Sequence, residues 1–199
     1  RRKLVRWSEA REGHRILDCA TGTGDLAFEF YRAVGSTGHV TGIDFVSEMI
    51  ALAKKKAELN KRTVVFEQGD ATQISLPDQS VDICSIAFGL RNVEDPVQCL
   101  REMARVTRKR GCIMILETGQ THIPVYREVF RFYYGWLMPK MGGYLSGQPK
   151  AYSYLQKSSV QFPYGAGLVK LIGEMREFEA VQARALSGGV CYMYKLRRR

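Results

Sequence analysis

Apolar and polar positions follow two alternating patterns over the first 118 residues. Short runs rich in Val and Ile are separated by stretches of about 12 residues with helical periodicity. The runs predict strands at 15–20, 38–45, 63–70, 81–88 and 111–118. The intervening stretches predict helices at 25–34, 47–60 and 95–111. The strands are too evenly apolar to face water on one side, so we expect a parallel sheet covered by helices on both faces.

Side chains that favour helix ends support two of these boundaries. Ser47 is placed to cap the second helix. Asp95 is placed to cap the third, with Pro96 at the first helical position and Gly111 after a basic last turn.

Residues 121–164 break the alternation and predict a helical insertion after the fifth strand. The segment holds eleven of the chain's 21 aromatic residues, five Lys or Arg and a single acid, Glu128. The pattern then predicts a helix over 167–178 and a closing hairpin over 180–196, with a Ser-Gly-Gly turn. No window approaches 18 uninterrupted apolar residues, so no transmembrane helix is predicted.

Composition indicates one globular domain, because 199 residues with 45% hydrophobic and 25% charged content can bury a substantial core. We divide it into a core (15–118), a helical insertion (121–164) and a closing helix and hairpin (165–199). The net charge is +10, with 13 basic and 14 acidic residues in 1–100 and 17 basic and 6 acidic residues in 101–199. An anionic partner is therefore expected to meet the second half.

The chain begins with Arg1 rather than Met, so we expect further residues upstream. Its basic start lacks the apolar stretch of a signal peptide. Five cysteines are scattered without a Cys-x-x-Cys pair, several within strand-like runs, which predicts buried, reduced thiols and a cytosolic compartment. The three histidines are isolated from one another, so no metal site is predicted.

The stretch "RILDCATGTGDLAF" raises the question of what its glycine loop holds. A phosphate-binding P-loop needs Lys-Ser/Thr after the second glycine, and Asp25 follows Gly24 instead. The dinucleotide pattern G-x-G-x-x-A does match from Gly22 to Ala27, and Asp44 lies 20 residues beyond Gly24. A tight turn with no ligand is the remaining alternative.

Three acids favour S-adenosyl-L-methionine over these ligands. Asp18, on the first strand, can meet a cationic ligand directly or through water, whereas it would repel pyrophosphate. Asp44 ends the second strand, where its oxygens can accept both ribose hydroxyls. Asp70 and Ala71 follow the third strand, where a carboxylate and a backbone N–H can read the adenine edge, although Asp70 could instead cap a turn.

The chain then resembles a known family. "LDCATGTGD", "GIDFVSEMI", "GDATQISLPDQSVD", "FGLRNVEDPVQCLREMARVTRKRG", "LE" and "AYSYLQKSSVQFP" together are similar to the UbiE/COQ5 methyltransferases of menaquinone and ubiquinone synthesis. The resemblance runs from about Arg15 to Gly189, and "FGLRNV" (88–93) is its most specific element.

The resemblance implies a Rossmann-like class I methyltransferase fold, an α/β fold with a seven-stranded sheet of order 3-2-1-4-5-7-6 and strand 7 antiparallel. It also implies S-adenosyl-L-methionine as cofactor and S-adenosyl-L-homocysteine as product. The residues expected at the cofactor are Asp18, Ala20, Gly22, Thr23, Gly24, Asp44, Met49, Asp70, Ala71 and Ala87. Family members often carry Ser at the last position, so Ala87 could act only through its backbone.

The implied chemistry is methyl transfer to a carbon of a polyprenyl quinol ring. Menaquinone synthesis (demethylmenaquinol as substrate) is the preferred interpretation, and the ubiquinone precursor 2-methoxy-6-polyprenyl-1,4-benzoquinol is the alternative. Asp25, Arg91 and Asn92 are the expected catalytic residues, with Arg91 stabilising a phenolate. Asp25 could instead be a first-turn helix acid, and Arg91 could be a salt-bridge residue of a loop.

Tyr152 and Tyr154, in the insertion, are the expected substrate contacts, although most aromatics there could simply pack. The resemblance implies a cytoplasmic enzyme in peripheral contact with an anionic membrane surface, and a homodimer is common among relatives. Members usually also carry an N-terminal segment with a Tyr-Asp…Asn motif, which this sequence lacks, and often a His after the Gly-Gly at 188–189.

Three competing functions are weighed against this one. Another lipid or phenol substrate would differ only in the insertion and in "FGLRNV". A nucleic-acid methyltransferase would fit the basic second half, but it typically carries Asn/Asp-Pro-Pro-aromatic where "FGLRN" stands, so no nucleic-acid partner is predicted. An NAD-dependent oxidoreductase would need a substrate domain that is not evident.

Overall fold

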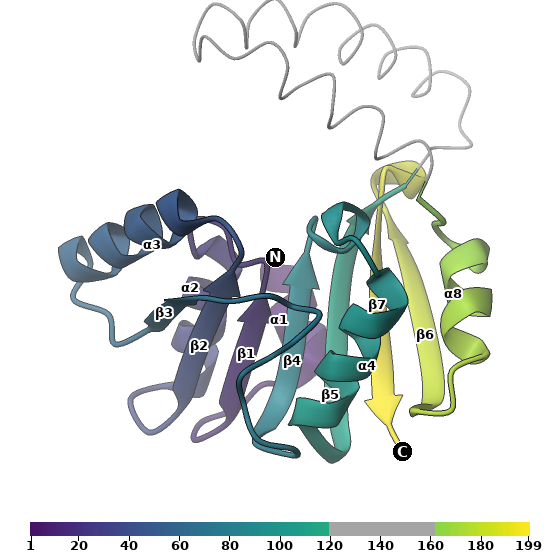
Figure 1. The fold of residues 1–199 in the computed structure, drawn as a ribbon, viewed down its shortest axis with the longest axis horizontal. Helices are drawn as coiled ribbons and strands as arrows, with labels where there is room; N and C mark the ends of the chain where they lie inside the picture. Colours follow the sequence, from purple (N-terminus) through teal and green to yellow (C-terminus); the bar gives the residue numbers. More distant parts are fainter. Residues whose placement is uncertain (120–161) are drawn as a thin grey trace, which may run out of the picture.

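A computed structural model describes residues 1–119 and 162–199 of the chain. One seven-stranded sheet has the order β3-β2-β1-β4-β5-β7-β6 (Figure 1). The strands are β1 Arg15–Cys19, β2 His39–Asp44, β3 Val65–Gln68, β4 Val81–Ala87, β5 Thr107–Thr118, β6 Phe178–Leu186 and β7 Cys191–Arg198. The helices are α1 Arg2–Ser8, α2 Asp25–Val34, α3 Ser47–Leu59, η1 Leu90–Asn92, α4 Pro96–Val106, α8 Ala166–Gly173 and η3 Ser187–Gly189.

Strands β1 to β5 pair in parallel, and β7 is antiparallel to both of its neighbours, β5 and β6. This confirms the predicted class I methyltransferase sheet and the predicted closing hairpin, whose turn is η3. Strand β6 joins the described sheet through β7 alone.

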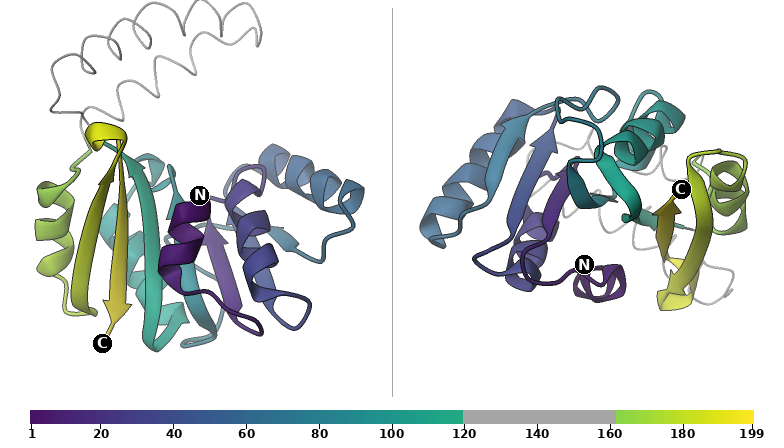
Figure 2. Two further views of the ribbon diagram at one scale, coloured as in Figure 1. Left: turned by 180° about the vertical axis from the view of Figure 1, so that it is seen from behind. Right: turned by 90° about the horizontal axis from the view of Figure 1, so that it is seen from below.

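Consecutive residues of a strand pack into two separate hydrophobic cores, because side chains alternate between the two faces of a strand. Leu17 and Ile113 belong to one core, under α4 and α8, whereas Ile16 and Met114 belong to the other, under α1, α2 and α3. Figure 2 shows α1 and α2 on the face opposite α4 and α8. The strands are evenly apolar because helices cover both faces of the sheet, as predicted.

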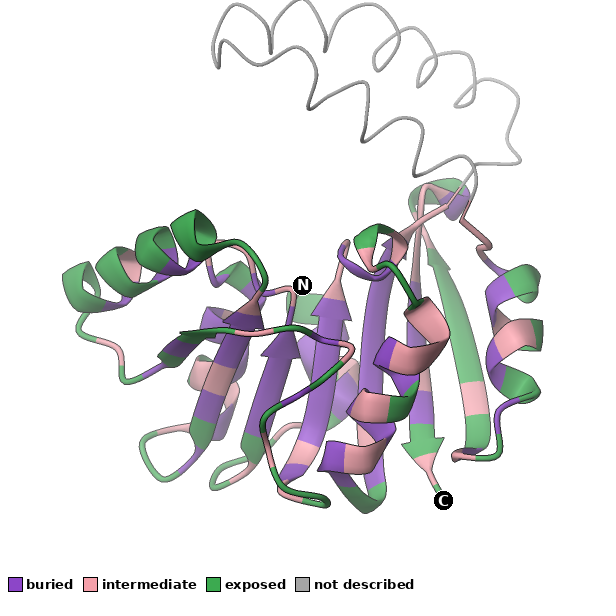
Figure 3. Ribbon diagram, viewed as in Figure 1, coloured by how far each residue is buried: buried purple, intermediate pink, exposed green. Residues whose placement is uncertain are grey.

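Burial is concentrated in the middle of the sheet. Figure 3 shows β1, β4 and β5 buried along most of their length, whereas β6 is exposed over most of its residues. The predicted insertion falls almost entirely at 120–161, outside the described residues, and so do Tyr152 and Tyr154.

One predicted helix cap and one predicted helix end are wrong. Helix α3 begins at Ser47 as predicted, but its N-cap is Val46 with no side-chain cap, and the Ser47 hydroxyl donates to the Glu48 carboxylate (3.1 Å). Helix α4 begins as predicted, with the Gln98 N–H donating to Asp95 Oδ1 (2.9 Å), but it ends at Val106. Residues 107–110 extend β5 instead, since Thr107 pairs with Val81 of β4.

Further differences involve short elements. Helix α8 ends at Gly173, before the predicted 178. Helix α1 was not predicted, because seven residues are too few for a clear helical period. Its Leu4 and Val5 are nevertheless buried in the core beneath α2.

Candidate active site

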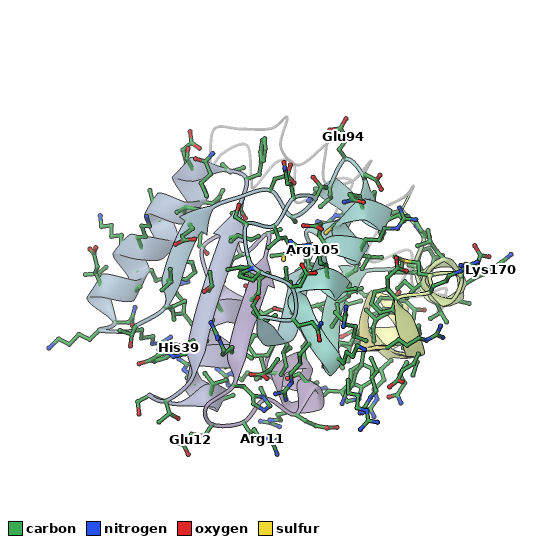
Figure 4. All side chains as sticks on the ribbon, turned by 60° about the horizontal axis from the view of Figure 1, so that its bottom comes forward. Arg11, Glu12, His39, Glu94, Arg105 and Lys170 are labelled. Atoms are coloured by element: carbon green, nitrogen blue, oxygen red, sulfur yellow. The ribbon has the colours of Figure 1, made fainter. Side chains whose placement is uncertain are left out.

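The predicted site residues gather at the carboxyl edge of the parallel strands. They lie at the ends of β1, β2 and β4, in the connections that follow β1 to β4, and in the first turns of α2 and α3, which share one edge of a parallel sheet. Figure 4 labels Glu94 at this edge, and Arg11 and Glu12 at the opposite one. Of the predicted site residues, Tyr152 and Tyr154 alone are not described.

The two glycines of the first loop serve different purposes. Gly22 (φ +57°) and Gly24 (φ +82°) both adopt left-handed backbone that glycine tolerates best. A Cβ at Gly24 would lie 2.5 Å from Phe66 Cζ, so this glycine allows the loop to pack on β3. A Cβ at Gly22 would meet no atom within 4 Å, so the loop has open space there.

Asp18 lies beneath this loop with 1% of its surface exposed. Its Oδ1 accepts the hydroxyl hydrogen bond of Ser85 (2.7 Å), and its Oδ2 accepts that of Thr21 (2.7 Å). Burial raises the pKa of Asp18 to about 6, against the opposing effect of these two hydroxyl hydrogen bonds. The structure therefore places Asp18 as a support that ties the loop to β4, and not in the loop's exposed wall.

Asp44 connects the end of β2 to the glycine loop. Its Oδ2 accepts the Gly22 N–H (2.7 Å), and its Oδ1 accepts the Val46 N–H (3.0 Å). Each carboxylate oxygen has two lone pairs, so each can still accept a ligand hydroxyl. Met49, in the first turn of α3, is 39% exposed.

Asp70 organises the loop after β3 as a turn residue. Its Oδ1 accepts both the N–H and the hydroxyl of Thr72 (2.8 Å each). Ala71 is buried with 8% exposed, and its methyl group carries no polar atom, so a polar contact with a ligand could come only from its backbone. The turn-capping alternative for Asp70 is therefore realised, and it leaves a carboxylate at the exposed rim.

Asp25 starts α2 and forms an ion pair with Lys56 of α3. Both side chains are nearly half exposed. They line a cleft of about 590 Å³ in which Lys56 and Arg62 also lie over the Phe28 ring, at 5.5 and 5.1 Å from its centroid. The partner of Asp25 in the structure is thus a lysine, and not Arg91 or Asn92.

Arg91 is held in a buried ion pair with Glu117, the penultimate residue of β5. The exposed fractions of the two side chains are 6% and 1%. The Arg91 backbone N–H also points to Glu117 Oε2 (3.3 Å), and Arg91 Nε is buried without a hydrogen-bond partner in the described part of the chain. The salt-bridge alternative for Arg91 is therefore realised, in the wall of the site.

Asn92 and its neighbours form a tight turn against the glycine loop. The Asn92 amide donates to the Phe88 carbonyl (3.3 Å), and Phe88 has left-handed backbone (φ +58°). A Cβ at Gly89 would overlap the Cβ of Ala20, itself left-handed (φ +47°). The loops after β1 and β4 are therefore in direct contact, with strained backbone on both sides.

Over residues 1–196, the chain matches the model of the ubiE/COQ5 methyltransferase family. The chain belongs to this family. It is accordingly an S-adenosyl-L-methionine-dependent methyltransferase, and the resemblance drawn from its motifs is confirmed.

Relatives of this ubiE/COQ5 protein match it over nearly its whole length. The Bdellovibrio bacteriovorus protein named ubiquinone/menaquinone biosynthesis C-methyltransferase UbiE is 50% identical over 98% of this chain and 83% of the relative. The Halalkalibacterium halodurans protein named demethylmenaquinone methyltransferase is 38% identical over 98% of this chain and 79% of the relative.

Solved structures share the fold at low identity. A SAM-dependent methyltransferase from Aquifex aeolicus has a TM-score of 0.71 at 22% identity and covers 99% of this chain and 88% of its own. A SAM-dependent methyltransferase from Thermotoga maritima has a TM-score of 0.66 at 16% identity, covering 100% and 87%. These likenesses support the sheet order.

The edge fits the adenosyl group of that cofactor. The space at Gly22 admits a ligand close to the backbone, and the lone pairs of Asp44 suit a pair of ribose hydroxyls. Exposed Val46 (44%) and Met49 offer apolar surface for a purine ring. The observed donors and acceptors are thus compatible with the predicted cofactor residues.

Several participants were not predicted from the sequence. Ser85 and Lys56 had no signal, since a strand serine and a helix lysine are ordinary residues. Glu117 had a recognisable signal, because an acid at the end of the apolar run "GCIMILET" needs a partner when buried.

In the described ranges, no group of three His, Cys, Asp or Glu is arranged to hold a metal ion. No helix there has the length and apolarity to cross a bilayer.

Proposed function

We propose that this chain methylates a ring carbon of a polyprenyl quinol and that demethylmenaquinol is its substrate. The observation that carries the proposal is the contact between the glycine loop at Ala20 and the turn that holds Arg91. A cofactor on the first loop and a phenol beside the second would be neighbours. The names of the two relatives support a quinone ring as the methyl acceptor.

The cofactor is proposed to bind along the carboxyl edge. Loop residues 22–24, with Ala20, would follow its amino-acid portion, with Asp18 holding the loop from beneath. Asp44 would accept the ribose hydroxyls, and Met49 would cover the base. The remaining proposed cofactor contacts are Asp70, Ala71 and the Ala87 backbone. When bound, S-adenosyl-L-methionine supplies a methyl group made electrophilic by its sulfonium.

Arg91 is proposed to stabilise the phenolate of the quinol. A neutral hydroquinone is a poor carbon nucleophile, and loss of a phenolic proton places charge on the ring carbon. A guanidinium donates hydrogen bonds and has no acceptor, so Arg91 would serve as a fixed cation and not as the base. Its Nε–H has no hydrogen-bond partner among residues 1–119 and 162–199, which supports an oxygen ligand at this place.

Asn92 and Asp25 are proposed to complete the catalytic set. The Asn92 side chain holds the Phe88 turn and presents an amide at the same edge. Asp25 would have to part from Lys56 to act on a proton, which its half-exposed position allows. Tyr152 and Tyr154 are proposed to contact the ring from the segment that is not described.

We also propose peripheral contact with an anionic membrane, in the cytoplasm, because the prenyl tail partitions into lipid. Phe45 (73% exposed) and Leu52 (52% exposed), with Lys54 and Lys55 of α3, would add to the contact that the basic second half of the chain is expected to make. Sedimentation with phosphatidylglycerol vesicles, but not with phosphatidylcholine vesicles, is expected and should weaken with salt. Light scattering on the same sample tests the expected homodimer.

The reaction is tested with labelled S-adenosyl-L-methionine and a chemically reduced lipid extract from a bacterium blocked at quinone methylation. We expect mass spectrometry to find the label in menaquinone. The unreduced extract is the matched control, since a quinone lacks the electron density to react. Label in a benzoquinone product would show that the substrate is a benzoquinol and not demethylmenaquinol. If no quinone is labelled although S-adenosyl-L-homocysteine binds tightly, the proposed function is refuted.

A further inference from the structure

Glu117 is a buried acid at the carboxyl edge that combines one ion pair with several hydrogen bonds. Its carboxylate forms the ion pair with Arg91 and accepts the Thr118 N–H (2.8 Å) and hydroxyl (3.2 Å) through Oε1. Its Oε2 faces the Arg91 backbone N–H at 3.3 Å. One carboxylate therefore holds Arg91 at two points, the main chain and the guanidinium.

We propose that Glu117 is the positioning residue that sets Arg91 for the methyl transfer. The inference rests on the proposed function, in which Arg91 stabilises the phenolate. Arginine has a long side chain with many rotamers, and a fixed partner is needed to hold its planar guanidinium in one place. Glu117 provides that partner without itself touching the substrate.

The backbone around the pair is rigid. Ala87 of β4 is in register with Leu116 of β5, and the Phe88 N–H donates to the Leu116 carbonyl (2.7 Å). Leu90, beside Arg91, is completely buried. Two adjacent strand ends thus fix the separation of the Glu117 and Arg91 backbones. A small change in the length of the side chain at position 117 therefore displaces the guanidinium.

The negative charge of Glu117 also affects phenolate formation, and this effect distinguishes a positioning role from a purely structural one. The buried pair is neutral overall, so the carboxylate opposes the formation of a nearby phenolate. Replacing it by an amide removes this opposition while loosening Arg91. Reach and charge can therefore be varied one at a time, with Glu117→Asp keeping the charge and Glu117→Gln keeping the length.

The control is Asp82 at the opposite edge, whose carboxylate also bonds one backbone N–H and one guanidinium, but from two different arginines. Its Oδ2 accepts the Arg15 N–H (2.6 Å), and its Oδ1 pairs with Arg108 Nη1 (2.5 Å). Asp82→Asn should lower the unfolding midpoint and leave kcat and its pH profile unchanged. It reports what losing such a clamp does when only stability is affected.

The experiment measures kcat, KM for both substrates, the pH profile of kcat and the calorimetric affinity for S-adenosyl-L-homocysteine. We expect both Glu117 variants to lose about 100-fold in kcat, the cost of a misplaced catalytic group, with cofactor affinity unchanged. Glu117→Gln should also move the rising limb of the profile to lower pH, and Glu117→Asp should not. Wild-type kcat in Glu117→Gln, or a loss that matches the unfolded fraction, overturns the proposal.

A second measurement does not depend on activity. Unfolding midpoints of Glu117→Gln, Arg91→Gln and the double variant form a double-mutant cycle. A double variant no less stable than either single one supports the clamp, and additive losses overturn it. If the wild type methylates no quinol, the proposed function fails, and this cycle still decides whether Glu117 fixes Arg91.

Discussion

Asp18 is predicted to make the chain less stable as the pH rises from 4 to 7. The carboxyl is buried under the glycine loop, and burial raises its pKa from 3.8 to about 6. Between these two values the folded chain holds a proton that the unfolded chain has released. Stability from this group is therefore fully present below the unfolded pKa and is lost as the pH passes through the folded one.

The size of the effect follows from the two pKa values. Their difference corresponds to about 3 kcal/mol, because one pH unit of pKa difference is worth about 1.36 kcal/mol. Asp18→Asn cannot ionise, so its free energy of unfolding should lack this component. Relative to wild type, the variant should gain about 3 kcal/mol between pH 3.5 and pH 7. Other acids titrate in both proteins, and their effects cancel in the difference.

Urea unfolding at several pH values between 3.5 and 8 measures this difference. Ser85→Ala is the companion variant: the Ser85 hydroxyl lowers the Asp18 pKa, so its loss should raise that pKa and steepen the pH dependence. Parallel stability curves for wild type and Asp18→Asn would refute the reasoning, whatever their vertical offset.

Three further predictions concern the same edge and the thiols. Asp44→Asn should lower the calorimetric affinity for S-adenosyl-L-homocysteine about 10- to 100-fold, because a charged acceptor is lost; unchanged affinity would remove Asp44 from the site. Gly24→Ala should destabilise by about 1–3 kcal/mol in urea through its overlap with Phe66, whereas Gly22→Ala should cost less stability and mainly weaken binding. Cys112 is half-buried, and burial raises the pKa of its thiol to about 12, so a disulfide reagent at pH 8 should label it slowly in the folded chain and rapidly after unfolding; equally rapid labelling of Cys112 in both states would contradict this.

The sheet was predictable because its strands carry a simple signal. Val- and Ile-rich runs between helical stretches fixed β1 to β5 to within a few residues, and the Ser-Gly-Gly turn located the final hairpin. The misplaced boundary at Val106 shows the limit. Helical pattern continues into Thr107 and beyond, but pairing with Val81 recruits those residues into β5, and pairing depends on tertiary structure.

The site was predictable in its membership and less so in its contacts. Parallel topology alone brings Asp18, Asp44 and Arg91 to one edge. The sequence does not reveal that Ser85 lies under Asp18 or that Glu117 lies beside Arg91, because these pairs are 67 and 26 residues apart. Their spatial proximity depends on strand register, which local patterns do not specify.

The position of β7 has a consequence for the order in which this protein can assemble. Strand β6 emerges from the ribosome before β7 but has no place in the described sheet until β7 pairs with β5. Until then, the 12-residue strand β5 presents an unpaired edge over its apolar stretch, Ile113–Leu116. Unpaired apolar edges invite pairing with other chains. A nascent chain paused before Cys191 would therefore be most prone to aggregation at β5, and a chaperone would be most useful there.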